Sequence, residues 1–123
     1  MRTELTALLD IEFPLIMAPM FLVSNQAMVE AAMDVGIAGA FPTLNYRDEK
    51  ELIGTLQALR KKQEGGVKGS YGVNIIVQKS NPFYKRHLEL CVENKVPFYI
   101  TSLGNPKEVI EKAHEYGAKV FCD

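Results

Sequence analysis

The sequence predicts an α/β protein built around a parallel sheet. Along its 123 residues, short apolar runs alternate with longer segments whose apolar residues recur at helical spacing. Most of the runs are continuous, which is typical of strands buried on both faces, and such strands occur in parallel sheets. The runs start roughly every twenty to thirty residues, the size of one strand-helix unit. The pattern alone leaves open whether the sheet is doubly wound or part of a closed barrel.

Five segments are predicted as strands: residues 14–18, 36–41, 69–77, 97–101 and 118–122. The first is followed by Pro19, which cannot donate to a strand ladder, so pairing is expected to stop there. The sequence stops at Asp123, where the fifth strand would pass into its loop. An open sheet usually ends in a helix that covers its last strand, so the chain is expected to be cut short.

Helix start and stop signals separate these strands. Asp48 followed by Glu51 is a capping-box arrangement, and apolar residues follow it at helical spacing. The other starts are polar residues that can cap a helix, two of them directly before a proline. They are Ser24 or Asn25, Asn81 before Pro82, and Asn105 before Pro106. Glycines are expected to end three of the helices, at positions 36, 65 and 117.

Composition excludes several classes of protein. The formal net charge is -1, with 47% hydrophobic and 24% charged residues. A chain without a basic surplus is not expected to bind nucleic acid or an anionic membrane. No apolar run is long enough to span a bilayer, and residues 1–10 lack the apolar core of a signal peptide. We therefore expect a globular, cytoplasmic protein.

The chemistry is expected where the strands end, because ligands of both α/β architectures gather at the carboxyl ends of the strands. The residues at these exits are apolar and amide-rich, and they lack the His, Cys and carboxylate density of a metal site. His87 and His114 fall within helix patterns and are predicted to lie on the surface. Cys91 and Cys122 have no metal-ligand spacing and are predicted to be small buried hydrophobic residues.

Asn74 is the most informative polar residue, because an Asn inside a strand is costly unless its donor and acceptor are both used. The edge of a heterocycle with adjacent acceptor and donor atoms would use both, and so would neighbouring backbone. No glycine-rich phosphate loop or Walker loop is present. Residues 103–106 can place a helix N-terminus near an anion, or they can form an ordinary helix start.

Four motifs resemble one known family. Residues 13–20 read FPLIMAPM, 36–40 read GIAGA, 71–74 read YGVN and 101–106 read TSLGNP. In this order and at this spacing they resemble the nitronate monooxygenase (2-nitropropane dioxygenase-like) family and the related flavin-dependent enoyl reductases of bacterial fatty-acid synthesis. The resemblance covers essentially the whole chain but only about half of a (β/α)₈ TIM barrel, which runs to ~250 residues. It implies that residues 1–123 are the N-terminal part, about five βα units, of a single barrel domain.

The resemblance also implies FMN at the barrel mouth. The residues after the first strand would line the flavin, the Asn of the third strand would bond its polar edge, and residues after the fourth would border the flavin or a small-molecule substrate. The implied cofactor-binding residues are Ala18, Pro19, Met20, Asn74, Thr101, Ser102 and Gly104. In the family the catalytic His follows the sixth strand and the phosphate loops follow the seventh and eighth. No catalytic residue is therefore predicted here, and the isolated chain is expected to be inactive.

Five strands cannot close a ring built for eight, because strand number, tilt and shear are linked. An open arc would expose inward-facing apolar side chains, predicted to be those of Ile16, Val73, Ile75 and Ile100, at a cost on the order of 10 kcal/mol. The chain is therefore expected either to lack a C-terminal half or to pair with another chain as a homo-oligomer.

The leading functional hypothesis is an FMN-dependent oxidoreductase of the nitronate monooxygenase type. It would pass electrons or a hydride to oxygen or to an activated alkene. The alternative is a non-catalytic half-barrel that oligomerises and binds a flavin, a nucleotide or nothing. A flavodoxin-like signalling domain would need an acidic cluster after the first strand, and residues 18–20 do not provide one.

Overall fold

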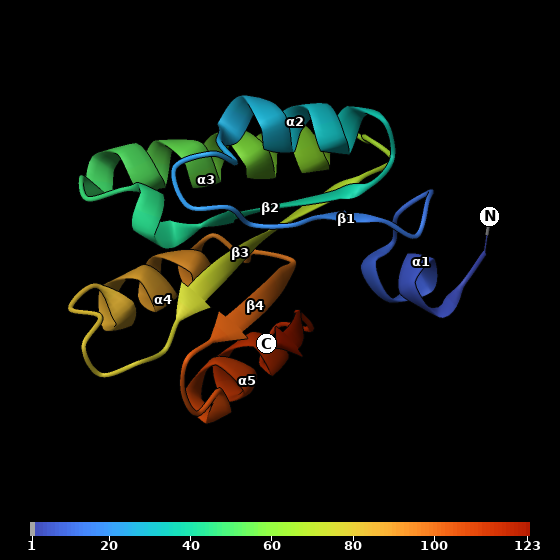
Figure 1. The fold of residues 1–123 in the computed structure, drawn as a ribbon. Coiled ribbons are helices and arrows are strands. Elements are labelled where there is room, and N and C mark those ends of the chain that lie inside the picture. Colours follow the sequence, from blue (N-terminus) through green and yellow to red (C-terminus); the bar gives the residue numbers. More distant parts are fainter. Residues whose placement is uncertain (1) are drawn as a thin grey trace.

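The computed structural model describes residues 2–123, and in them five strands alternate with helices (Figure 1). The elements are α1 (Glu4–Leu9), β1 (Ile16–Met17), α2 (Gln26–Asp34), β2 (Ala38–Pro42), the 3-10 helix η1 (Thr43–Asn45), α3 (Glu49–Glu64), β3 (Ser70–Ile76), α4 (Tyr84–Glu93), β4 (Phe98–Ser102), α5 (Lys107–His114) and β5 (Lys119–Cys122). No helix of residues 2–123 is long and apolar enough to cross a membrane.

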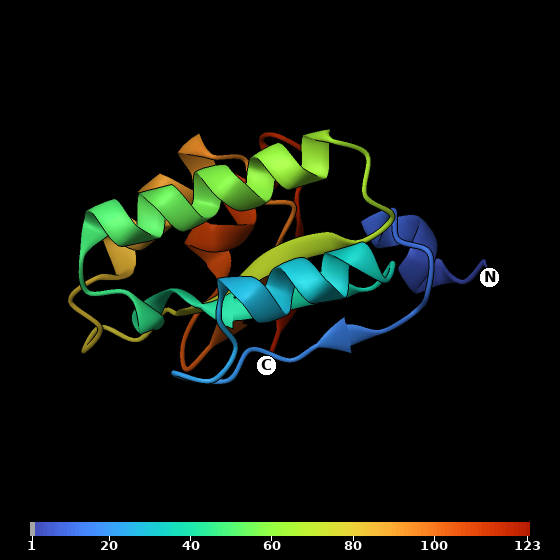
Figure 2. The same cartoon turned by 90° about the horizontal axis from the view of Figure 1, so that it is seen from above.

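The strands form one sheet in the order β1-β2-β3-β4-β5, and every neighbouring pair is parallel. The sheet is curved, and α2 and α3 run side by side along its outer face (Figures 1 and 2). A parallel sheet whose sequential strands are joined by helices on one face is the N-terminal half of a TIM barrel. The predicted fold class is confirmed.

The larger core lies between the sheet and the helices α2 to α5. Its members from the strands include Phe41, Tyr71, Val73, Ile75 and Tyr99, all at most 1% exposed. Val73 and Ile75 therefore face the helices, and the prediction that they face the barrel interior is wrong. Side chains alternate along a strand, so Gly72 and Asn74 of β3 lie on the inner face. Ile16 and Ile100 do pack with the inner cluster, as predicted.

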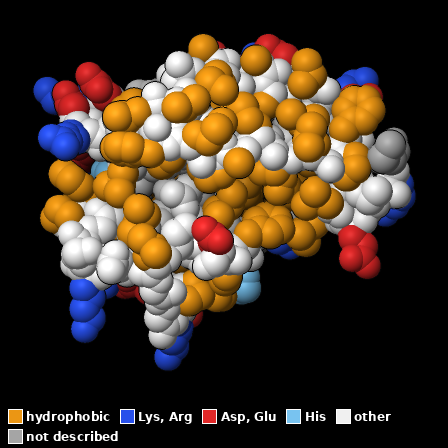
Figure 3. All heavy atoms as spheres, in the orientation of Figure 1, with side chains coloured by type: hydrophobic (Ala, Val, Ile, Leu, Met, Phe, Trp, Pro, Cys, Tyr) orange, Lys and Arg blue, Asp and Glu red, His pale blue; other side chains and the backbone are white. Residues whose placement is uncertain are grey.

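The inner cluster is smaller and is closed by α1 at the amino-terminal end of the sheet. Leu9 and Ile11 pack there with Ala38, Ala40 and Phe98. The chain after α1 is fixed by the amide of Glu12, which donates to the carbonyls of Gly36 and Lys68. Apolar side chains continue over the concave face of the half-barrel (Figure 3).

Two of the predicted helix starts are confirmed and two are not. Asn25, not Ser24, caps α2, and Asp48 caps α3 by accepting from the Lys50 amide. Asn81 does not cap a helix: its Oδ1 accepts from the Phe83 amide, and its Nδ2 donates to the Ile76 carbonyl at 2.8 Å. Because Asn81 closes the loop after β3, α4 begins only at Tyr84. Asn105 precedes the N-cap of α5, which is Pro106, and its Oδ1 accepts from the Lys107 amide.

Two side chains have an exposure opposite to the one predicted for them. His87 is only 4% exposed and stacks on the Phe83 ring at 5.4 Å, so the prediction of a surface position is wrong. Burial lowers the pKa of His87, although the nearby carboxylate of Glu49 acts in the opposite direction. Cys122 is exposed, since β5 is an edge strand of the sheet, whereas Cys91 is buried as predicted and burial raises its pKa.

Candidate functional site

The predicted site residues follow β1, β3 and β4, or lie in them. Because all five strands are parallel, their carboxyl ends meet at one end of the half-barrel, opposite α1 (Figure 1). Ala18 to Met20 follow β1, Asn74 lies near the end of β3, and Thr101 and Ser102 end β4. The topology thus brings residues far apart in the sequence to one rim of the sheet.

Asn74 and Ser102 are in direct contact across the β3–β4 pair. Asn74 Nδ2 donates to Ser102 Oγ and to the Ile100 carbonyl, each at 2.9 Å. Both side chains are half-buried on the inner face of the sheet. No donor among residues 2–123 is bonded to Asn74 Oδ1. The donor of the amide is therefore used within the protein, and its acceptor remains available to a ligand.

Thr101 and Gly104 occupy different surroundings from Ser102. Thr101 is 2% exposed, and alternation along β4 places it with Ile75 and Tyr99 on the face that the helices cover. Gly104 has a φ of +156°, and a Cβ there would lie 2.9 Å from Val77 Cγ2. Glycine thus lets the loop after β4 lie against the end of β3.

The loop after β1 presents four consecutive apolar side chains to solvent. Met20 is 40%, Phe21 59%, Leu22 70% and Val23 54% exposed. The turn is held from inside by Ser24, which is fully buried. Ser24 Oγ accepts from the Met20 amide at 2.8 Å and donates to the Met20 carbonyl at 3.1 Å. This part of the rim is therefore apolar, and hydrogen bonds fix the conformation of its turn.

Sequence reasoning missed the residue that fastens this loop to the rest of the sheet. Asn45, at the end of η1, accepts from the Leu22 amide at 2.7 Å and donates to the Ser24 carbonyl at 2.9 Å. Its one signal in the sequence was its place after the second strand, which it shares with several other polar residues.

A hollow of about 670 Å³ opens between the loops after β3 and β4. Gly104 and Leu103 line it from one side, and Gln78, Lys79 and Tyr84 from the other. Lys85 also lines it, and its ammonium group pairs with Glu108 at 2.9 Å. This pairing lowers the pKa of the Glu108 carboxyl. The hollow lies at the same end of the sheet as Asn74 and Ser102.

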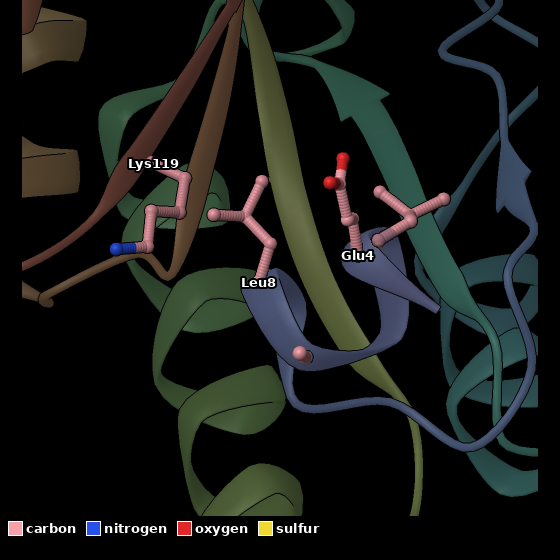
Figure 4. A pocket seen from close by; sticks show the side chains of 5 residues that line it. Glu4, Leu8 and Lys119 are labelled. Atoms are coloured by element: carbon pink, nitrogen blue, oxygen red, sulfur yellow. The ribbon is translucent and has the colours of Figure 1, made fainter. Parts of the chain in front are cut away.

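A second hollow, of about 690 Å³, lies at the opposite end and contains none of the predicted site residues. Glu4 and Leu8 reach it from α1, and Lys119 from β5 (Figure 4). It borders the free edge of β5 and the exposed side of α1. Its position indicates an uncovered flank of the half-barrel, not a catalytic cleft.

No protein-family model and no curated protein sequence matches the chain. Among solved structures, FabK from Thermotoga maritima matches 99% of this chain with a TM-score of 0.83 and 30% identity, and the chain covers 37% of that protein. The M276A mutant of the same FabK matches with a TM-score of 0.82 and 29% identity, again over 99% of this chain and over 39% of the FabK chain. The chain therefore spans well under half the length of either structure. It shares its fold, the N-terminal half of a TIM barrel, with part of FabK.

Proposed function

We propose that these residues belong to an FMN-dependent oxidoreductase of the nitronate monooxygenase type and form the N-terminal part of its flavin site. The observation that carries the proposal is the state of Asn74, whose amide nitrogen is committed to β4 while its amide oxygen has no donor within residues 2–123. The likeness to FabK and the four sequence motifs support the same assignment.

The residues present fit one part of FMN. The polar edge of an isoalloxazine carries an N–H group between two carbonyl oxygens, and Asn74 Oδ1 is the kind of acceptor that such an N–H needs. Met20 and its apolar neighbours offer a surface for a flat ring, and thioether sulfur packs well on aromatic faces. Ala18 and Pro19 would approach the ring through their backbone. Ser102 and Gly104 would border the flavin or the substrate, and Thr101 would support them from the helix side.

When bound, FMN would supply the transfer of electrons or a hydride, while the protein supplies binding, orientation and acid-base groups. The residues described here would provide binding and orientation. The phosphate anchor and the proton-transfer residue of the resembled family follow later strands, so we assign them to other parts of the same domain. The acceptor would be oxygen or an activated alkene in a small-molecule substrate.

We further propose that additional strands, not a second copy of this chain, cover the concave face. The sheet has free edges at β1 and β5, and a TIM barrel closes with eight strands. Two copies would bring ten strands to that ring, whereas three further units would complete it. The greater length of FabK agrees with this choice.

The direct test is to purify the full-length protein that contains these residues and to record its visible spectrum. We expect the yellow absorbance of bound flavin, its loss on reduction, and release of FMN on denaturation. A protein that purifies without flavin and does not take up added FMN would overturn the proposal.

The same preparation distinguishes the two chemistries of this fold family. Oxygen consumption with an alkyl nitronate would indicate a nitronate monooxygenase. Oxidation of a reduced nicotinamide that depends on an enoyl thioester would indicate an enoyl reductase and would contradict the nitronate assignment.

A further inference from the structure

Asn45 joins two of the loops that meet at the rim. It belongs to the exit of β2, yet both of its amide groups bond to the loop after β1. Oδ1 accepts from the Leu22 amide at 2.7 Å, and Nδ2 donates to the Ser24 carbonyl at 2.9 Å. A side chain that uses its acceptor and its donor on one loop fixes both the position and the direction of that loop.

The bonds continue from Asn45 to Met20 through Ser24. Ser24 Oγ bonds both backbone groups of Met20, and the amides of Val23 and Ser24 also donate to the Met20 carbonyl at 3.0 Å. A displacement of the Ser24 backbone would therefore move Met20. The predicted flavin-lining residue is thus tied to η1, which follows β2, by a continuous set of hydrogen bonds.

The loop is held in a form that its own sequence does not favour. Leu22 has a φ of +60°, a left-handed conformation that is uncommon for a residue other than glycine. Four consecutive apolar side chains, at positions 20–23, are 40% to 70% exposed, and within residues 2–123 nothing buries them further. Internal apolar packing therefore contributes little to the shape of the loop. Hydrogen bonds hold it instead, both those of the Asn45 and Ser24 side chains and those of the backbone amides to the Met20 carbonyl.

We propose that Asn45 is a positioning residue of the flavin site, which holds the loop of residues 20–23 in its binding conformation before the cofactor arrives. The inference rests on the proposed function, because it assigns the loop to FMN. A loop ordered in advance loses less conformational entropy when the ligand binds, so its affinity for the ligand is higher. Asn45 acts through the backbone of Ser24 and Leu22 and need not touch the flavin.

The test compares three variants of the full-length protein: Asn45→Ala, Ser24→Ala and the matched control Asn94→Ala. Asn94 also donates through Nδ2 to a backbone carbonyl, that of Leu90 at 2.9 Å, but it lies at the end of α4. The control therefore loses a comparable bond away from the rim. Thermal unfolding identifies any variant whose fold is lost.

Two measurements are needed. The first is hydrogen exchange of the Val23 and Ser24 amides, which bond the Met20 carbonyl within the loop and so report its order without any cofactor. The second is titration of the apoprotein with FMN, followed by quenching of flavin fluorescence and by the absorbance bands of the bound flavin.

In Asn45→Ala we expect exchange of the Val23 and Ser24 amides to accelerate about tenfold or more and the FMN dissociation constant to rise about tenfold, as for one or two lost hydrogen bonds. Ser24→Ala should weaken FMN binding similarly, and Asn94→Ala should change neither quantity. An Asn45→Ala protein that binds FMN as tightly as the unaltered protein would overturn the inference, as would a Ser24→Ala protein with unchanged affinity. Failure of the proposed function is distinguishable, because the unaltered protein itself would then bind no FMN.

Discussion

The ring of Phe98 on β4 lies directly over Gly72 on β3, and a Cβ at position 72 would be 2.5 Å from Phe98 Cε2. The strand residues beside this pair are also small, Ala38 and Ala40 on β2. Large and small side chains thus complement one another across the inner face of the sheet. Phe98 also meets Phe121 of β5 edge to face at 5.9 Å, so one ring links three strands.

Gly72→Ala should destabilise the protein by about 1–3 kcal/mol, because the added methyl group would overlap a buried ring. Gly54→Ala is the matched control, since nothing lies within 4 Å of a Cβ there and the residue is inside α3. It should stabilise the protein by about 0.5–1 kcal/mol. Urea unfolding measures both changes, and equal stability of the two variants would contradict the packing described here.

Asn74→Ala should raise the FMN dissociation constant of the full-length protein more than Ser102→Ala does. The first change removes the whole amide, and one or two lost bonds cost about 1–3 kcal/mol. The second leaves Asn74 bonded to the Ile100 carbonyl, so its Oδ1 stays in place. Fluorescence titration with FMN measures the dissociation constants of both variants. If Asn74→Ala has no effect, Asn74 serves only to bond β3 to β4.

Acid should destabilise the protein through His87. Burial lowers the folded-state pKa of His87 below the unfolded value, so as the pH falls the unfolded state binds the proton first. The free energy of unfolding should therefore be highest above about pH 6.5 and decrease as the pH falls toward the folded pKa. His87→Leu should flatten this dependence below about pH 6.5.

The control for His87 is His114→Gln, because His114 is exposed on α5. This variant should keep the slope of the unaltered protein. Urea unfolding at several pH values provides the comparison. A slope that persists unchanged in His87→Leu would show that another group titrates.

Tyr116→Phe should cost more stability than Tyr99→Phe. The Tyr116 hydroxyl donates to the Val96 carbonyl at 2.8 Å and lies 2.6 Å from the Tyr99 hydroxyl. Removing it leaves two polar groups without a partner, at about 1–3 kcal/mol each when buried, whereas Tyr99→Phe leaves the bond to Val96 intact. Thermal unfolding measures the stability of the two variants. A larger loss of stability in Tyr99→Phe than in Tyr116→Phe would contradict the contribution assigned here to the bond with Val96.

The fold class was predictable because strands buried on both faces are continuous apolar runs, and each of the five predicted runs overlaps an observed strand. The same property hid which face each residue takes. When both faces of a strand are apolar, the alternation of its side chains does not show which of them face the barrel interior. Val73 and Ile75 were therefore assigned to the wrong side. The glycine and asparagine at positions 72 and 74 mark the inner face, but only once the register with β4 is known.

The candidate site was predictable residue by residue but not as a set of contacts. Asn74 stands out in the sequence, yet its partner Ser102 is 28 residues away and is placed only by the pairing of β3 with β4. Asn45 had no distinguishing pattern, because its function depends on a turn 21 to 23 residues earlier. The burial of His87 involves stacking on Phe83, which helical periodicity alone does not define.

The order of strands in the sheet is the same as their order along the chain. Each strand therefore finds its neighbour in a segment synthesised just before it, and no strand must wait for a distant partner to emerge. Short separations between contacting segments favour rapid folding, and a chain made from its amino terminus can fold in the same direction. During synthesis on the ribosome, each newly made strand and helix can therefore be added to a sheet that has already formed.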